Sequence, residues 1–217
     1  MKVIAADRKD EIIEYGRKMV AKNLTTGTGG NLSIYDREKN MMAITPSGIP
    51  YEEMNSEDIV VTDLNGDIVE GERKPSSELS LHRRVYERRD DIDAVVHTHS
   101  TFATVISCLG EELPPVHYMI AAAGGSCVPL AEYARYGTVD LAENAVSSLG
   151  EEYRAVLLAN HGLLAAGGSL KAAFEVAETI EFVAELYYRT ENVGDPQLLD
   201  QDQMAEVREA FASYGQQ

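Results

Sequence analysis

Apolar residues recur at helical spacing in several stretches of the chain, and this periodicity predicts amphipathic helices. The helices are expected over residues 7–22, 79–86, 100–109, 138–149, 169–190 and 202–213. Small polar or acidic residues precede most of these stretches and are suited to cap a helix N-terminus. We expect Asp7 or Asp10 to cap the first helix, Ser76 or Ser77 the second and Ser169 the longest.

Short apolar runs between the helices predict strands. Alternating residues predict one hairpin over 32–34 and 42–44, and residues 59–61 and 68–69 flank the turn signal Asn65-Gly66. Continuous apolar runs at 93–96, 155–159 and 163–165 predict further strands. Helices and hairpins alternate with little sign of crossover units. The order predicts an α/β fold: a three-layer sandwich with a mostly antiparallel central sheet covered by helices.

The 217 residues and 44% apolar content suit one domain spanning 1–217. No apolar run reaches the roughly 18 residues that span a bilayer, and the N-terminal residues do not form a signal peptide. Cys108 and Cys127 are expected as free thiols, which favours a cytoplasmic protein. A net charge of −17 argues against nucleic acid or an anionic membrane as partner. Halophilic proteins share such acidity, so a salt-loving source is a hypothesis that stability in dilute buffer would test.

Histidines at the ends of two apolar runs are candidate metal ligands. His97 and His99 alternate along a strand, so both imidazoles point to one face. His161 follows the run 155–159, and Glu78 lies at a helix start. Three imidazoles and a carboxylate suit Zn²⁺ and would also accept Co²⁺ or Mn²⁺. Four fixed ligands would make a structural site, whereas a mobile Glu78 would open a catalytic position. His82 and His117 are expected to be structural.

Three pairs of small polar residues lie at predicted turns or at a helix start: Gly30-Asn31, Ser47-Gly48 and Ser76-Ser77. Backbone N–H groups and hydroxyls at such places can hold a phosphate without a cationic side chain. Each pair is also ordinary turn or cap chemistry. Tyr118 and Tyr214 offer phenols that can donate a proton to a developing alkoxide, although packing is the common role of a tyrosine.

Six ordered motifs, read together, resemble the class II aldolase/adducin family. They are Thr28–Ser33 (TGGNLS), Thr45–Tyr51 (TPSGIPY), Pro75–Glu78 (PSSE), Val95–His99 (VVHTH), His117–Gly125 (HYMIAAAGG) and His161–Leu163 (HGL). The resemblance implies an aldolase that cleaves L-fuculose 1-phosphate or a related deoxy-sugar phosphate to dihydroxyacetone phosphate and an aldehyde. It also implies a homotetramer with active sites between subunits.

The resemblance further implies roles for individual residues. One Zn²⁺ per subunit would be held by His97, His99 and His161, with Glu78 as resting fourth ligand and as base. The phosphate would be held by Gly30, Asn31, Ser47, Gly48, Ser76 and Ser77. Tyr118 would reach in from a neighbouring subunit as the acid, and Tyr214 in the tail would help at the aldehyde end. Tyr136 stands where the resemblance leads us to expect phenylalanine, and we expect its extra hydroxyl to alter the aldehyde pocket.

Other functions on the same fold remain open. A sugar-phosphate 4-epimerase would use the same bond cleavage with different acid and base residues, and a methylthioribulose-phosphate dehydratase would eliminate water. An adducin-like interaction module without catalysis would be expected to lack the metal ligands. A plain zinc hydrolase would share the three histidines but would leave the phosphate-type clusters unexplained.

Overall fold

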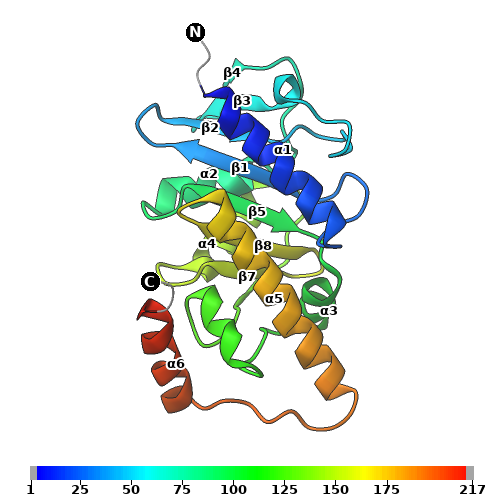
Figure 1. Cartoon of the computed structure of the whole chain (residues 1–217), viewed down its shortest axis with the longest axis vertical. Coiled ribbons are helices and arrows are strands. Elements are labelled where there is room, and N and C mark those ends of the chain that lie inside the picture. The colour runs from blue at the N-terminus through cyan, green and yellow to red at the C-terminus, as the bar shows by residue number, and fades with distance from the viewer. Residues whose placement is uncertain (1–3, 214–217) are drawn as a thin grey trace.

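A computed structural model describes residues 4–213 and places one eight-stranded sheet at the centre of the molecule (Figure 1). The strands are β1 (Asn31–Asp36), β2 (Met41–Ile44), β3 (Val60–Asp63), β4 (Ile68–Glu70), β5 (Ala94–Thr98), β6 (Leu130–Ala131), β7 (Ala155–Leu158) and β8 (Gly162–Gly167). Their spatial order is β4-β3-β2-β1-β5-β8-β7-β6, and every pair is antiparallel except β6–β7. The predicted α/β sandwich with a mostly antiparallel sheet is confirmed.

Helices cover both faces of this sheet. They are α1 (Ala6–Ala21), α2 (Leu79–Arg88), α3 (Thr101–Leu109), α4 (Val139–Leu149), α5 (Leu170–Glu191) and α6 (Gln201–Ser213), with 3-10 turns η1 (Ser56–Asp58) and η2 (Tyr118–Ala123). Helices α1 and α5 cross one face, and α2 and α4 lie behind the other (Figure 1). Because the central strands are buried on both faces, they read as continuous apolar runs.

Strand β5 lies near the middle of the sheet and sets the position of the histidines. Ala94 and Val96 face the layer with α1 and α5, whereas Val95 faces the layer with α2 and α4. Alternation therefore turns His97 toward α2. Both neighbours of β5 are antiparallel to it, so β1 and β8 begin where β5 ends. This antiparallel arrangement brings Asn31, His99 and His161 together at the same end of these three central strands.

Two of the expected helix caps are wrong. Helix α1 begins after Ala5, and neither Asp7 nor Asp10 caps it. Helix α2 begins at Leu79 with Glu78 as the N-cap residue, whose side chain makes no capping hydrogen bond. That carboxylate points instead at the histidines, and the Ser76 hydroxyl accepts the Glu78 N–H. The Ser169 cap of α5 is confirmed by its hydrogen bond from Ala172.

The pattern also missed two short elements. Strand β6 has two residues, and η2 is a 3-10 turn in a segment rich in alanine and glycine. Both are too short for periodicity to register. None of the helices in residues 4–213 is long and apolar enough to cross a membrane.

Candidate metal centre and phosphate cavity

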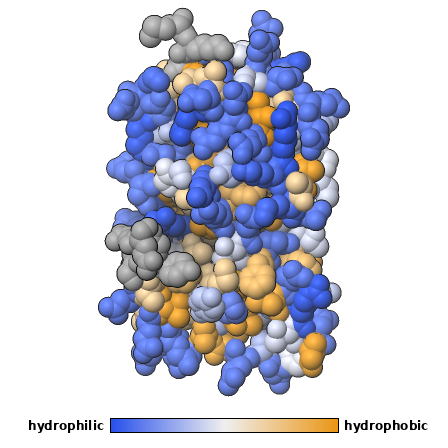
Figure 2. Space-filling model, in the orientation of Figure 1, coloured by the Kyte–Doolittle hydropathy of each residue, from blue (hydrophilic) through white to orange (hydrophobic). Residues whose placement is uncertain are grey.

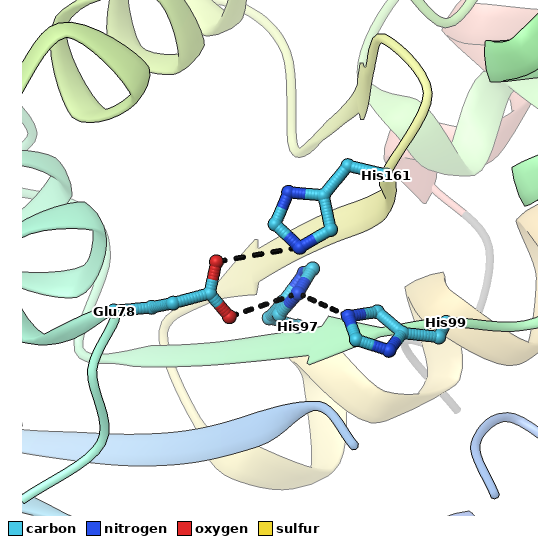
Figure 3. Close-up of side chains that lie close together, drawn as sticks. All are labelled: Glu78, His97, His99 and His161. Atoms are coloured by element: carbon cyan, nitrogen blue, oxygen red, sulfur yellow. Dashed lines mark hydrogen bonds and ion pairs between the residues drawn. The ribbon is translucent and has the colours of Figure 1, made fainter. Parts of the chain in front are cut away.

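Four side chains from three separate parts of the chain converge at the end of β5. Glu78, His97, His99 and His161 each offer a ligand atom, and these four atoms lie within 4.8 Å of one another. Figure 3 shows the carboxylate and the three rings turned toward a common point. Glu78 Oε2 lies 3.2 Å from His97 Nε2, and Glu78 Oε1 lies 3.4 Å from His161 Nε2. The His97 and His99 Nε2 atoms are 3.0 Å apart.

These spacings fit a metal ion. Ligand atoms about 2.0 Å from a tetrahedral zinc lie about 3.3 Å from one another, which is close to the three separations above. Among the described residues, the buried Glu78 Oε1 has no hydrogen-bond partner, although a buried carboxylate oxygen ordinarily requires one. The donor set of three imidazoles and one carboxylate matches the preference of Zn²⁺ and similar divalent cations.

The orientation of His97 is fixed from behind. Its Nδ1 lies 3.0 Å from the backbone oxygen of Leu163 on β8. A carbonyl oxygen can only accept, so Nδ1 carries the hydrogen and Nε2 is the atom left to bind a cation. The second partner of a metal-binding histidine is ordinarily such a carbonyl or carboxylate.

The charge states at neutral pH also favour a cation. Burial lowers the pKa of His99 and His161 to about 4, with the neighbouring His97 as the second cause, so both rings are neutral. Burial opposes the charge of Glu78, but His97 and His161 hold the pKa of its carboxyl well below the usual range. Burial opposes a proton on His97, yet the Glu78 carboxylate raises its pKa. A bound cation would replace that proton, because a neutral histidine ring binds a metal through the nitrogen that carries no hydrogen.

A cavity of about 460 Å³ opens beside the four side chains. All six of the phosphate-binding candidates line it: Gly30, Asn31, Ser47, Gly48, Ser76 and Ser77. Glu78, His99 and His161 line it as well. The structure therefore brings the two sets of candidates together around one space.

Hydrogen bonds to backbone oxygens join the three loops that line the cavity, which lie around residues 30, 47 and 76. Ser47 N–H donates to Lys74 O and Ser76 N–H donates to Thr45 O, at 3.1 and 3.0 Å. The buried Tyr51 hydroxyl donates to Gly30 O at 2.9 Å, which ties the first loop to the second. These bonds connect residues between 21 and 31 positions apart in sequence.

The cavity is suited to an anion despite the acidic surface of the protein. The lining residues of the cavity include no lysine or arginine within the described part of the chain. The N-terminus of α2 follows Ser76, Ser77 and Glu78, and helix N-termini favour anions through their N–H groups and dipole. Gly30 and Gly48 adopt left-handed backbone conformations, with φ of +69° and +73°, which suit tight loops.

Of the two tyrosine candidates, Tyr118 is described by the structure and does not line this cavity. Tyr118 is 50% exposed on η2, where its ring packs against His117 and Phe211. Tyr214 lies outside the described residues. His117, expected to be structural, accepts a hydrogen bond from Met119 N at its Nδ1 and does not join the cluster.

Sequence reasoning missed one aromatic residue of the cavity. Tyr133 lines the cavity and is 65% exposed. Tyr136, which was expected to alter the aldehyde pocket, lines the cavity too. Both belong to the loop before α4, and Gly137 brings this loop against Ser77: a Cβ there would lie 2.8 Å from Ser77 O. A tyrosine in an irregular loop carries no periodic signal, so only the fold places it.

Comparisons with known proteins agree with this site. The model of the Class II Aldolase and Adducin N-terminal domain matches residues 10–188. The 5-deoxy-D-ribulose 1-phosphate aldolase of Bacillus thuringiensis serovar kurstaki is 51% identical over 209 residues, which cover 96% of this chain and 97% of that protein. The L-fuculose phosphate aldolase of Escherichia coli K12 is 41% identical, covering 94% of each chain. A solved L-fuculose 1-phosphate aldolase structure matches with a TM-score of 0.93 and 53% identity, covering 96% of this chain and 98% of that one.

The fold, the cluster of three histidines with one glutamate and these relatives define a metal-dependent aldehyde-lyase of the class II type. The chain belongs to the class II aldolase and adducin family.

Proposed function

We propose that this protein is a zinc-dependent aldolase that reversibly cleaves a deoxy-ketose 1-phosphate to dihydroxyacetone phosphate and an aldehyde. One observation carries the proposal: the Glu78, His97, His99 and His161 cluster opens into the same cavity as all six phosphate-binding candidates. A plain zinc hydrolase would need the histidines alone. An adducin-like module would need neither the ligands nor the cavity.

Two groups of relatives suggest the substrate class. Their names specify 5-deoxyribulose 1-phosphate or L-fuculose phosphate as substrate, and one name of the first group adds 5-methylthioribulose 1-phosphate. Both ketose phosphates share the three carbons that become dihydroxyacetone phosphate, and they differ in the aldehyde released, which has two carbons in the first case and three in the second. We favour 5-deoxyribulose 1-phosphate, supported by the relative that is 51% identical, and we take L-fuculose 1-phosphate as the second candidate.

The residues have distinct tasks in this proposal. Gly30, Asn31, Ser47, Gly48, Ser76 and Ser77 hold the phosphate and thereby position the ketose against the histidines. A divalent cation bound by His97, His99 and His161 would supply Lewis-acid polarisation of the ketose carbonyl.

Proton transfers are assigned to two side chains. In the condensation direction, the Glu78 carboxylate takes the proton from the carbon next to the carbonyl, because it lies at the cavity wall and is anionic at neutral pH. Tyr118 protonates the new alkoxide, and Tyr214 assists at the aldehyde end. In the cleavage direction these transfers run in reverse.

Tyr118 can act in this way only from another copy of the chain, since it lies away from the cavity of its own subunit. We propose a homotetramer in which η2 packs beside a neighbour's cavity. Two exposed aromatic residues support such an interface: Tyr118 and Phe182, whose rings both contact His117, are 50% and 43% exposed. Figure 2 shows apolar residues gathered in the lower part of this face, over η2 and the C-terminal half of α5.

The test is a screen of ketose 1-phosphates for release of dihydroxyacetone phosphate, followed by NADH oxidation in a coupled assay. We expect cleavage of 5-deoxyribulose 1-phosphate, loss of activity with a chelator and recovery with Zn²⁺. Epimerisation without release of dihydroxyacetone phosphate would instead identify a 4-epimerase, and loss of water would identify a dehydratase. A covalent adduct trapped by borohydride would indicate a lysine mechanism and contradict the proposal.

A further inference from the structure

A chain of buried hydrogen bonds runs from Glu78 into the layer between the sheet and α2. Asn31 Nδ2 donates to Glu78 Oε2 at 2.9 Å. His82 on α2 then lies between two residues of β1: its Nε2 faces Asn31 Oδ1 at 2.5 Å, and its Nδ1 faces Ser33 Oγ at 2.6 Å. Ser33 Oγ lies 2.6 Å from the hydroxyl of Tyr86.

The direction of every hydrogen in this chain follows from its first member. A carboxylate only accepts, so the Asn31 group facing Glu78 is the NH₂ and the group facing His82 is the carbonyl oxygen. That oxygen also only accepts, so His82 Nε2 carries the hydrogen. His82 Nδ1 of the neutral ring then accepts from the Ser33 hydroxyl. Tyr86 in turn donates toward Ser33.

We propose that His82 is a positioning residue for the metal and base site: its Nε2–H holds the Asn31 amide with the NH₂ group toward Glu78 and the cavity. The inference rests on the proposed function, which makes Glu78 the base and Asn31 a phosphate-binding residue. A free amide can turn about its last bond, which would place Oδ1 against the carboxylate. The repulsion between the two oxygens would push Glu78 away from the histidines. The turned amide would also offer a phosphate less hydrogen-bond donation, because its NH₂ group would face His82.

Because His82 is buried, its hydrogen bond determines the orientation of the Asn31 amide. His82 is 0% exposed and Asn31 is 5% exposed, so water cannot readily replace either partner. His82 is also one helical turn after Glu78 on the same stretch of chain. Helix α2 and its N-cap residue therefore carry both Glu78 and His82, and His82 orients the Asn31 amide that donates to Glu78.

A pair of substitutions matched in length tests the proposal. His82→Gln retains an amide N–H that can donate to Asn31 Oδ1, whereas His82→Met has a similar length and no donor. We measure the zinc affinity of the metal-free protein by competition with a chromogenic chelator. We expect His82→Met to bind zinc about 10-fold more weakly, the scale of other outer-shell changes, and His82→Gln to stay within about threefold of the unsubstituted protein.

A double-mutant cycle distinguishes positioning from a general structural effect. If His82 acts through Asn31, His82→Met should weaken zinc binding no further once Asn31→Ala is present. Tyr86→Phe is the control: it removes a buried hydroxyl from the far end of the chain while leaving the Ser33–His82 bond, so it should lower thermal stability without changing zinc affinity. If His82→Met does not fold, Ser33→Ala replaces it, because it releases the ring tautomer and should also weaken zinc binding only when Asn31 is present.

Three results would overturn the proposal: unchanged zinc affinity in His82→Met, equal losses in the Met and Gln variants, or additive losses with Asn31→Ala. None of these measurements needs a substrate. If the protein cleaves no ketose phosphate while the zinc cycle behaves as expected, the proposed function fails and the role of His82 stands. When cleavage is measurable, kcat should fall in His82→Met and not in Tyr86→Phe.

Discussion

His97 donates the hydrogen on its Nδ1 to the backbone oxygen of Leu163, 3.0 Å away on the adjacent strand. This bond leaves Nε2 directed at Glu78 and His99. Since Leu163 pairs with Thr98 in the same ladder, the ladder that builds the sheet also sets the orientation of the ring. His97 is the fully buried member among the three histidines of the cluster, and so the one with the most restricted ring.

We therefore expect His97→Ala to lose metal and aldolase activity together. Removing a direct ligand should weaken zinc binding by at least about 100-fold, the upper end of what outer-shell changes cost. Metal content after dialysis, measured by mass spectrometry, checks this. His117→Ala is the control, because this histidine lies outside the cluster and should leave the metal content unchanged. Retention of zinc by the His97 variant would remove it from the ligand set.

Replacement of Glu78 separates its two proposed tasks. Glu78→Gln keeps the shape and can still offer an oxygen near the three imidazoles, so zinc should stay largely bound. The amide cannot take a proton, so exchange of the carbon-bound hydrogen of dihydroxyacetone phosphate with D₂O should slow by about 10²–10⁴-fold. Proton NMR follows the exchange. A variant that exchanges at the unsubstituted rate would contradict the role of Glu78 as base.

Mixed oligomers can test whether Tyr118 acts across a subunit boundary. Tyr118→Phe should slow carbon–carbon cleavage more than hydrogen exchange, because it removes the proton donor and leaves the base. Tyr118→Phe and Glu78→Gln subunits, each with low activity alone, should regain activity when they are unfolded together and refolded into mixed oligomers. Such oligomers contain cavities with an intact Glu78 beside an intact Tyr118 from a neighbour. Failure to recover activity would indicate that Tyr118 does not act from a neighbouring subunit.

Much of the fold was predictable because long elements carry strong periodic signals. The helix expected over 138–149 is observed over Val139–Leu149, and the expected antiparallel hairpins form β1–β2 and β3–β4. Cap positions were less predictable where a side chain serves the site. Ser76 and Ser77 are good capping residues, but α2 begins after Glu78, whose carboxylate is directed to the histidines.

The metal cluster was predictable because strand ends and a helix start place its members, and the antiparallel neighbours of β5 bring them to one edge. Residues that reach the site from irregular loops, or that act on it through buried hydrogen bonds, were not predictable from the sequence. Tyr133 reaches the cavity from an irregular segment. His82 was expected to be structural, and it is buried, but its link to Glu78 through Asn31 exists only once β1 lies against α2. Periodicity identifies buried faces and cannot show which polar atoms meet there.

Gly30 is expected to tolerate no side chain. A Cβ at this position would lie 2.5 Å from the backbone oxygen of His97, and its φ of +69° disfavours other residues. Gly30→Ala should therefore move β1 away from β5, weaken zinc binding and destabilise the protein by more than the roughly 1–2 kcal/mol of a left-handed alanine. Gly27→Ala is the matched control, since Gly27 also has a positive φ, +62°, but open space at its Cβ. Urea unfolding of both variants gives the comparison, and equal destabilisation would contradict the proposed clash with His97.

The stability of the metal-free protein should depend on pH through His82. Burial lowers the pKa of this ring to about 3, whereas an unfolded histidine titrates near 6.5. Below pH 6.5 the unfolded state therefore binds one proton more than the folded state at this position, and stability falls as the pH falls toward 3. At 1.36 kcal/mol per pH unit, His82 should make the folded state about 2 kcal/mol less stable at pH 5 than at neutral pH. His82→Gln removes this titration, so its unfolding free energy should change less between pH 7.5 and pH 5 than that of the unsubstituted protein. Both are measured by urea unfolding at the two pH values after removal of metal. Identical pH dependence in the two proteins would mean that His82 takes up a proton in the folded state as readily as in the unfolded state. The hydrogen-bond direction assigned to Ser33 would then be wrong, because a charged ring donates from Nδ1 as well as from Nε2.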